Sequence, residues 1–225
     1  FLAEQSTTYN NLLGEAHARL RPTPLLSAFT GGCLQSGRDV TAGGARYNSS
    51  GVACIGLADV TDSLLAIKTL VYDQGKVTLD KLRAAVNDDF QGHDMLHAIV
   101  RKKVPLFGSG DADALKMARR VSGLAHDIFD RRQNSRGGPY RAGFWSMSNH
   151  VAFGNLTGAL PSGRKAGKAF TPGLTPQPGA SPSLLDNLRD VAGLDPRSMP
   201  NNIAFNVKVV PRAGEPASAT VDTMT

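Results

Sequence analysis

The sequence of 225 residues is poor in cysteine and has no long apolar run. Its 2 cysteines, Cys33 and Cys54, are too few for a disulfide framework and form no Cys-x-x-Cys pair. Every apolar stretch falls short of the roughly 18 residues that a membrane helix needs, and no leader pattern precedes the first helical pattern. We therefore expect a soluble, cytoplasmic protein with reduced thiols and no membrane partner.

Aromatic residues are also scarce, at 6% of the chain, and they do not alternate with basic ones. The 25 basic and 19 acidic residues give a net charge of +6, but the basic residues form short, scattered groups such as Arg101-Lys102-Lys103. A nucleic-acid surface combines basic residues with aromatic side chains that stack on bases. The basic residues are therefore interpreted as a solvated surface, and no nucleic-acid partner is expected.

The chain does contain enough apolar residues, 41%, to bury a core. Apolar residues at helical spacing predict helices over residues 4–20, 63–72, 78–86, 92–103, 111–133 and 183–192. Short apolar or alternating runs predict strands over residues 52–60, 142–148 and 203–210. The expected helix caps are Thr61 or Asp62, Thr78, and Ser109 or Asp111. This order of elements indicates an α/β fold.

Two irregular segments separate these elements. Residues 27–51 are rich in glycine and are expected to be extended and tightly turning. Residues 154–179 form a long stretch without a regular pattern, which in an α/β domain is usually functional or part of an interface.

Three short motifs are better explained by structure than by chemistry. His93 and His97 have the spacing of a zinc-protease pair, but the position of the general base carries Asp94 and no third ligand is indicated, so no metal is expected. The run 108–110 fits a helix start better than a dinucleotide turn, because no strand precedes it. The run 162–165 lacks the context of a phosphate loop and is interpreted as a surface turn.

Two clusters place functional side chains close together. The first is Gly-Gly-Ala-Arg-Tyr-Asn at residues 43–48, which ends at Asn48. The second spans residues 140–150 and contains Arg141, Trp145 and His150 on or beside one predicted strand. Alternate strand residues face one way, so Arg141, Gly143 and Trp145 could line a pocket with a cation and an aromatic wall. The alternative is a buried strand whose Arg141 pairs with a carboxylate.

The ordered set of motifs resembles the glycyl radical enzymes, the pyruvate formate-lyase-like proteins. The resemblance covers nearly the whole chain, and the set is more specific than any single motif. The matching segments are residues 32–37, 43–48, 56–68, 143–153, 160–164, 173–176 and 201–206.

This resemblance implies a ten-stranded α/β barrel made of two five-stranded half-barrels, of which residues 1–225 would form one half-barrel region. It also implies a thiyl cysteine that abstracts hydrogen from a buried substrate, and a glycine that stores a backbone radical. No cofactor is bound directly, because an activating enzyme with S-adenosylmethionine and an iron–sulfur cluster installs the radical. The expected partners are a small-molecule substrate, that activating enzyme and a second copy of the full-length parent.

Three departures from the family pattern qualify the resemblance. Arg120-Val121-Ser122-Gly123 matches the glycine motif but is followed by Leu124 and lies within the longest predicted helix, so it is not expected to carry the radical. Cys33 sits just before the Gly-Gly-Ala-Arg-Tyr-Asn motif rather than on the thiyl loop. Many members carry an acidic residue two positions after this cysteine, where the chain has Gln35, which cannot exchange a proton at neutral pH.

The chain begins at Phe1 rather than Met and ends inside a polar run, so it is interpreted as an internal fragment that lacks both radical residues and is inactive alone. The parent is expected to be a lyase that breaks a C–C or C–X bond of a small anionic substrate. Decarboxylases of the arylacetate type and sulfonate lyases of the isethionate type come first, and dehydratases and choline-type lyases stay open. The candidate substrate-binding residues are Arg141, Trp145, Gln35, Asn48 and His150. The alternative is a non-catalytic α/β scaffold or binding module.

Overall fold

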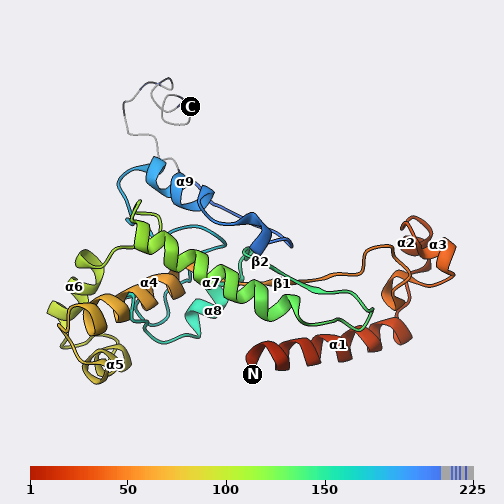
Figure 1. The fold of residues 1–225 in the computed structure, drawn as a ribbon, viewed down its shortest axis with the longest axis horizontal. Coiled ribbons are helices and arrows are strands. Elements are labelled where there is room, and N and C mark those ends of the chain that lie inside the picture. Colours follow the sequence, from red (N-terminus) through yellow and green to blue (C-terminus); the bar gives the residue numbers. More distant parts are fainter. Residues whose placement is uncertain (209–213, 215, 217, 219–220, 222–225) are drawn as a thin grey trace.

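The computed structural model describes residues 1–208, 214, 216, 218 and 221. Two regions lie side by side along its long axis (Figure 1). The first three helices, α1 (Leu2–Leu20), α2 (Pro24–Ala28) and α3 (Cys33–Ser36), form an arm at one end. The remaining elements form the body. No helix among the described residues is long and apolar enough to cross a membrane.

The body is built around a two-stranded parallel sheet. Strand β1 (Ser50–Ala53) pairs with β2 (Tyr140–Gly143), with Ser50 opposite Tyr140. Beyond β2, a parallel bridge joins Phe144 to Ile203, so the chain near residue 203 continues the sheet on the other side of β2. Parallel strands need a long crossover connection, and here the crossover is helical.

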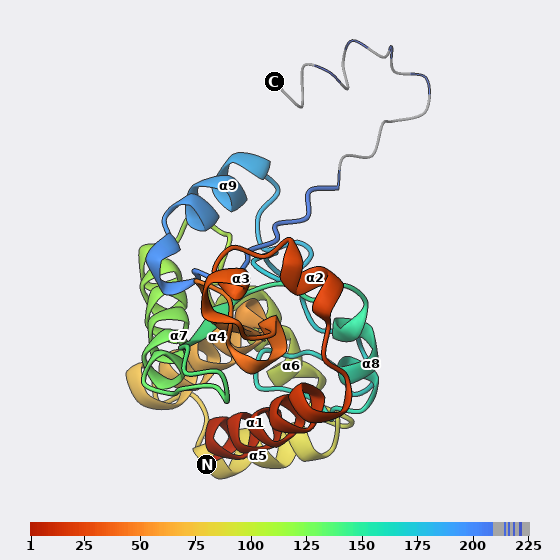
Figure 2. The same cartoon turned by 90° about the vertical axis from the view of Figure 1, so that its right-hand side faces the viewer.

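Four helices make up this crossover. They are α4 (Leu57–Ile67), α5 (Leu79–Asn87), α6 (Asp94–Lys103) and α7 (Ala112–Asp130), and a π-helical stretch, Lys68–Asp73, extends α4. Helices α4 and α7 pack against each other, and α7 also contacts β2. After β2 come α8 (Asn149–Asn155) and α9 (Leu184–Ala192), which lie on opposite sides of the body (Figure 2).

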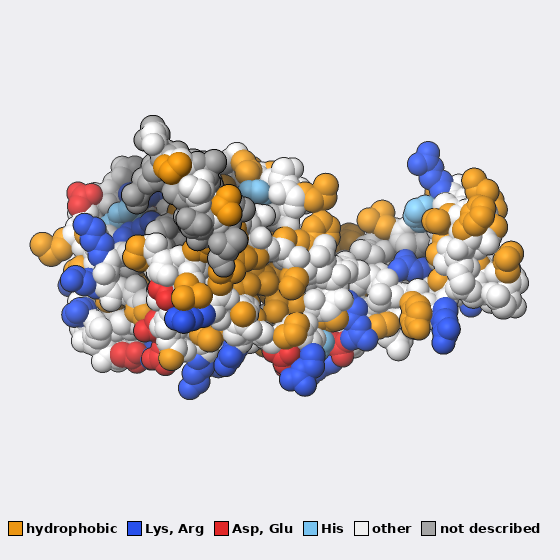
Figure 3. Space-filling view, turned by 90° about the horizontal axis from the view of Figure 1, so that it is seen from above, with side chains coloured by type: hydrophobic (Ala, Val, Ile, Leu, Met, Phe, Trp, Pro, Cys, Tyr) orange, Lys and Arg blue, Asp and Glu red, His pale blue; other side chains and the backbone are white. Residues whose placement is uncertain are grey.

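The core lies between α4, α7 and the strands. One buried cluster combines residues of α4 and α7 with Phe144, just after β2, and with residues of the connecting loops: Leu57, Ala58, Phe107, Ala118, Phe144, Leu174, Leu194 and Met199. On α7, Leu115, Val121 and Ala125 pack against this cluster, as the predicted apolar stripe requires. The arm behaves differently, because Leu12, Leu13 and Leu20 of α1 are exposed despite their helical spacing. Apolar side chains also gather on the surface of the arm in the view from above (Figure 3).

Most predicted helices are confirmed, including two of their caps. The Oγ1 of Thr78 accepts a hydrogen bond from the Lys81 amide at the start of α5. The Oδ1 of Asp111 accepts one from the Ala114 amide at the start of α7. The family-like run 120–123 lies inside α7, as expected.

The predicted strand over residues 52–60 is wrong in its second half. The strand ends at Ala53, and α4 begins at Leu57 after Gly56, whose φ of +84° lets the chain turn sharply into the helix. Thr61 and Asp62 therefore lie inside α4 and do not cap a helix that starts at residue 63. The apolar run was misleading because α4 is buried on most of its faces.

The later strands also differ from the prediction. Strand β2 covers residues 140–143 rather than 142–148, and residues 149–155 form the unpredicted helix α8. Of the strand expected over residues 203–210, only Ile203 bridges to another strand within the described residues, and 209 and 210 lie outside them. The segment 27–51 is not extended throughout, since it contains α3 and a 3-10 turn at Val40–Ala42.

Candidate functional site

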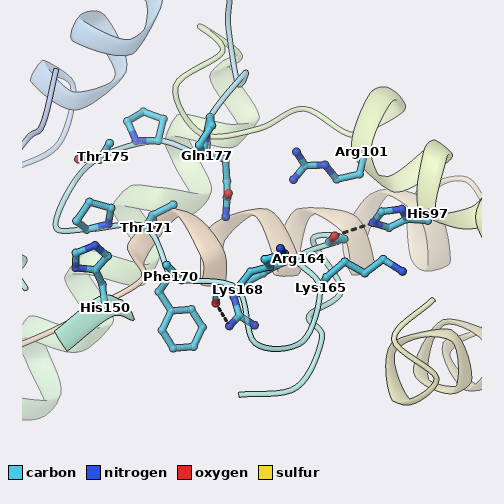
Figure 4. Close-up of a pocket in the computed structure, with 15 residues that line it drawn as sticks. His97, Arg101, His150, Arg164, Lys165, Lys168, Phe170, Thr171, Thr175 and Gln177 are labelled. Carbon is cyan, nitrogen blue, oxygen red and sulfur yellow. Dashed lines mark hydrogen bonds between the residues drawn. The ribbon is translucent and has the colours of Figure 1, made fainter. Parts of the chain in front are cut away.

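A cavity of about 500 Å³ lies between α6, α8 and the loop formed by residues 163–178 (Figure 4). Helix α6 contributes His97 and Arg101, and α8 contributes His150. The loop contributes basic, hydroxyl and apolar groups: Gly163, Arg164, Lys165, Lys168, Ala169, Phe170, Thr171, Pro172, Thr175, Pro176, Gln177 and Pro178. The long irregular segment of the sequence thus forms most of the cavity wall.

Asp59 of α4 anchors this loop through hydrogen bonds. Its side chain is only 1% exposed. Its Oδ2 accepts hydrogen bonds from the amide and the hydroxyl of Thr171, both at 2.7 Å. Its Oδ1 accepts one from the Gln177 side-chain amide, also at 2.7 Å. Both oxygens of this buried carboxylate are therefore hydrogen-bonded, as buried polar atoms usually are, and their bonds fix the position of the loop.

Arg164 is a buried cation that holds the loop from within. It is 5% exposed and donates to the backbone carbonyls of Gly154, Gly158 and Lys168. Its guanidinium lies 4.4 Å from the centre of the Phe170 ring, a cation–π distance. Because burial disfavours the charged form, it lowers the pKa of Arg164. The expectation that residues 162–165 form a surface turn is wrong, since Ser162 and Arg164 are both buried.

Asp62 lies one turn further along α4 and is fully buried. Its Oδ1 accepts a hydrogen bond from the Phe107 amide at 2.9 Å, while its Oδ2 has no partner among the described residues. Burial raises the pKa of this carboxyl to about 8, and the nearby charge of Asp59 adds to the shift. At pH 7 the group is therefore mostly protonated.

The two histidines at zinc-protease spacing, for which no metal was expected, have different partners. The Nε2 of His97 lies 2.7 Å from the carbonyl oxygen of Gly163, and its ring packs near Phe90. The Nε2 of His93 lies 3.4 Å from a carboxylate oxygen of Asp88. His97 thus binds the cavity loop, and the spacing of the two residues reflects helix geometry.

Of the five candidate substrate-binding residues, His150 lines the cavity, and its Nδ1 lies 2.9 Å from the Ser146 hydroxyl. Arg141 lies in β2 and forms an ion pair with Asp130, the arrangement that the alternative interpretation described. Trp145 follows two residues after the end of β2, and its indole nitrogen is buried without a partner among the described residues.

The other two candidates lie in the arm and in the segment that follows it. Asn48 donates to the carbonyls of Gly43 and Ala45, at 3.3 and 2.7 Å, and so closes the 43–48 loop on itself. Gln35 is exposed in α3, where its side-chain oxygen accepts a hydrogen bond from the Gly32 amide. The structure therefore does not bring all five residues to one place within this chain.

Sequence reasoning missed the residues that build the cavity, namely Asp59, Gln177 and Arg164. One signal for Asp59 was present. It lies with Asp62 at i, i+3 in a largely apolar run, and carboxylates in such a run are usually paired when they are buried. Gln177 and Arg164 lie in an irregular segment, where no periodic pattern indicates burial.

A family model described as "Pyruvate formate lyase-like" matches residues 1–154. The chain belongs to this family. A trans-4-hydroxy-L-proline dehydratase of Clostridioides difficile is 32% identical over 170 residues, which are 76% of this chain and 22% of that protein. A (2S)-3-sulfopropanediol dehydratase of Klebsiella oxytoca is 34% identical over 166 residues, which are 73% of this chain and 20% of that protein.

The solved structures of family members show the same fold. The glycerol-bound form of the B12-independent glycerol dehydratase from Clostridium butyricum superposes with a TM-score of 0.85 and 31% identity, covering 90% of this chain and 26% of that one. The predicted fold class is confirmed: the chain corresponds to part of a pyruvate formate-lyase-type α/β barrel. It spans about a fifth of the length of the two curated relatives.

Proposed function

We propose that residues 1–225 form part of the barrel of a glycyl radical lyase, and that the whole protein eliminates water from a small substrate. The main support is that three quarters of the chain match a hydroxyproline dehydratase and that the chain shares its fold with a glycerol dehydratase. These relatives move dehydration ahead of the decarboxylase and sulfonate-lyase classes that the sequence placed first.

The chemistry would require two groups that other parts of the protein supply. A thiyl cysteine would abstract a hydrogen atom from the substrate, and a C–O bond would then break. The radical would be stored on a glycine and installed by an activating enzyme that uses S-adenosylmethionine and an iron–sulfur cluster. The protein would act in the cytoplasm as a homodimer. Such chemistry needs a site that excludes water from reactive intermediates, and a closed barrel would provide one.

Within this chain, we assign substrate contacts to the five candidate residues. Arg141 would hold an anionic group of the substrate, and Trp145 would form an aromatic wall whose unpartnered indole N–H can donate to the substrate. Gln35, Asn48 and His150 would supply polar contacts. Arg141 is ion-paired with Asp130 and both side chains are about 40% exposed, so exchange of the carboxylate for a substrate anion costs little.

The test uses the intact protein, activated without oxygen, with the glycyl radical verified by electron paramagnetic resonance. Turnover is measured on trans-4-hydroxy-L-proline, (2S)-3-sulfopropanediol, glycerol, isethionate and an arylacetate. Loss of water from one of the first three, dependent on the radical, is expected. An intact protein that forms no radical with any activating enzyme would instead support the scaffold alternative.

The role of Arg141 is tested separately. Arg141→Ala is expected to raise KM for an anionic substrate by about tenfold or more, because a charge-assisted hydrogen bond is lost. Arg131→Ala is the matched control, since Arg131 is exposed and its side chain makes no hydrogen bond or ion pair with the described residues. Unchanged KM in Arg141→Ala would refute the assignment while leaving the reaction class intact.

A further inference from the structure

We propose that the cavity between α6, α8 and the 163–178 loop binds the oxyanion group of a small organic molecule, a phosphate, sulfonate or carboxylate. The proposal rests on Arg101, Lys165 and Lys168 and does not depend on the proposed function. Of the five residues proposed to contact the substrate, only His150 lines this cavity, and the oxyanion proposal does not involve His150.

Among the residues that the structure describes, the cavity wall carries four cations and no carboxylate. Arg101, Arg164, Lys165 and Lys168 all line it. Within the part of the chain that the structure describes, none of the four forms an ion pair. The Arg164 guanidinium donates to backbone carbonyls and lies over the Phe170 ring, while the charges of Asp59 and Asp89 act on it without forming an ion pair. Concave sites lined by one sign of charge concentrate ions of the opposite sign.

Three carboxyl groups, those of Asp59, Asp62 and Asp89, interact with cations of the wall, but none of them lines the cavity. Asp59 lies under the loop with both oxygens engaged by Thr171 and Gln177. Asp62 is buried in α4 and is mostly protonated at pH 7. Asp89 accepts a hydrogen bond from the Ala166 amide at 2.8 Å and does not line the cavity. Part of the Arg164 charge is thus offset by Asp59 and Asp89. Arg101, Lys165 and Lys168 line the cavity without an ion pair among the described residues, and the proposal therefore rests on them.

Two of the cations have all their donors available. The side chains of Arg101 and Lys168 form no hydrogen bond with any described residue, and Arg101 extends into the cavity toward the side of Gln177 (Figure 4). The Lys165 ammonium donates one hydrogen bond to the backbone carbonyl of Asp89 and keeps its other two N–H groups available. Thr175 accepts from the Asn206 amide and keeps its hydroxyl proton for a ligand. A guanidinium with an ammonium and a hydroxyl is a donor set suited to an oxyanion.

The rest of the cavity indicates an organic ligand. A volume of about 500 Å³ is within the range of small-molecule sites and exceeds what a bare phosphate needs. Phe170, Pro172, Pro176 and Pro178 give the wall an apolar part beside the cations. A molecule with one oxyanion group and a small apolar remainder would satisfy both parts.

The test is calorimetric titration of the intact protein, without an installed radical, at constant ionic strength. The probes are inorganic phosphate and phenyl phosphate, with benzyl alcohol as a neutral control. Phenyl phosphate is expected to bind more tightly than inorganic phosphate, and benzyl alcohol is expected not to bind. Arg101→Gln and Lys168→Gln should each weaken phenyl phosphate binding by about fivefold or more, since each removes a charged donor.

Lys102→Gln is the matched control, because Lys102 is the next residue on α6, is exposed and does not line the cavity. Arg101 and Lys168 are exposed, so their variants are expected to unfold at the wild-type temperature without ligand. Absence of phosphate binding, or equal binding by the Arg101→Gln/Lys168→Gln double variant, would overturn the proposal. So would an acidic segment of the protein itself found in the cavity. Because no turnover is measured, these outcomes are separate from failure of the proposed activity.

Discussion

Removal of the Asp59 carboxylate is expected to release the loop that forms the cavity wall. In Asp59→Ala, the Thr171 amide and hydroxyl and the Gln177 side chain all lose the acceptor that they reach at 2.7 Å. Thr171 is only 4% exposed, so water cannot readily replace the lost acceptor.

The magnitude follows from these bonds. A hydrogen bond to a charged group contributes about 1.5 to 3 kcal/mol, and two of the three bonds hold Thr171. Their loss should lower the free energy of opening the loop by about 3 kcal/mol or more, which is roughly a hundredfold change in the opening equilibrium.

Hydrogen exchange measured by mass spectrometry on the intact protein tests this prediction. Peptides covering residues 170–178 should exchange about a hundredfold faster in Asp59→Ala, whereas peptides from the middle of α7 should not change. Asp59→Asn, which keeps one acceptor oxygen, should show a smaller acceleration. Asp127→Ala is the control, because Asp127 is exposed on α7 and its side chain makes no hydrogen bond with the described residues. Unchanged exchange over residues 170–178 in Asp59→Ala would show that other contacts hold the loop.

Three further changes test other parts of the structure. The folded protein keeps a proton on Asp62 up to about pH 8 that the unfolded chain loses near pH 4, so the free energy of unfolding should fall as pH rises through this window, by up to roughly 6 kcal/mol. Asp62→Asn should remove most of that fall in denaturant titrations at pH 5, 7 and 9, and a fall that persists in the variant would contradict the assignment. Gly44→Ala would place a Cβ 1.9 Å from the Arg38 carbonyl oxygen and should destabilise the protein by about 1–3 kcal/mol, whereas Gly31→Ala, with nothing within 4 Å, should be nearly neutral in the same titrations. Thr78→Ala should cost about 1 kcal/mol through loss of the α5 cap, and an unchanged midpoint would exclude a capping role.

Helices were predictable where local sequence dictates them. Helix α7 has an apolar stripe of period 3.6 and an aspartate cap at Asp111. Both features involve residues that are close together in sequence, so a short window of sequence is enough to recognise them. Family membership was also predictable, because it depends on the order of several motifs along the chain and needs no knowledge of contacts.

The strands were harder to place, because their determinants are distant in sequence. Strand β1 has four residues and pairs with β2 through the contact of Ser50 with Tyr140 across the whole helical crossover. Four residues carry too little alternation to fix a boundary. Helix α4 was mistaken for part of a strand because it is buried on most of its faces, so its apolar residues show no clear period.

The sequence by itself determined most of the helical segments, the caps Thr78 and Asp111, and the family, since each follows from spacing and residue type along the chain. Only the tertiary structure decided the cavity. Asp59 anchors residues 171 and 177, and Arg164 is bound by the carbonyls of residues 154, 158 and 168 within an irregular loop. The burial of a charged group depends on which distant segment supplies its partners, and a one-dimensional pattern does not encode that choice.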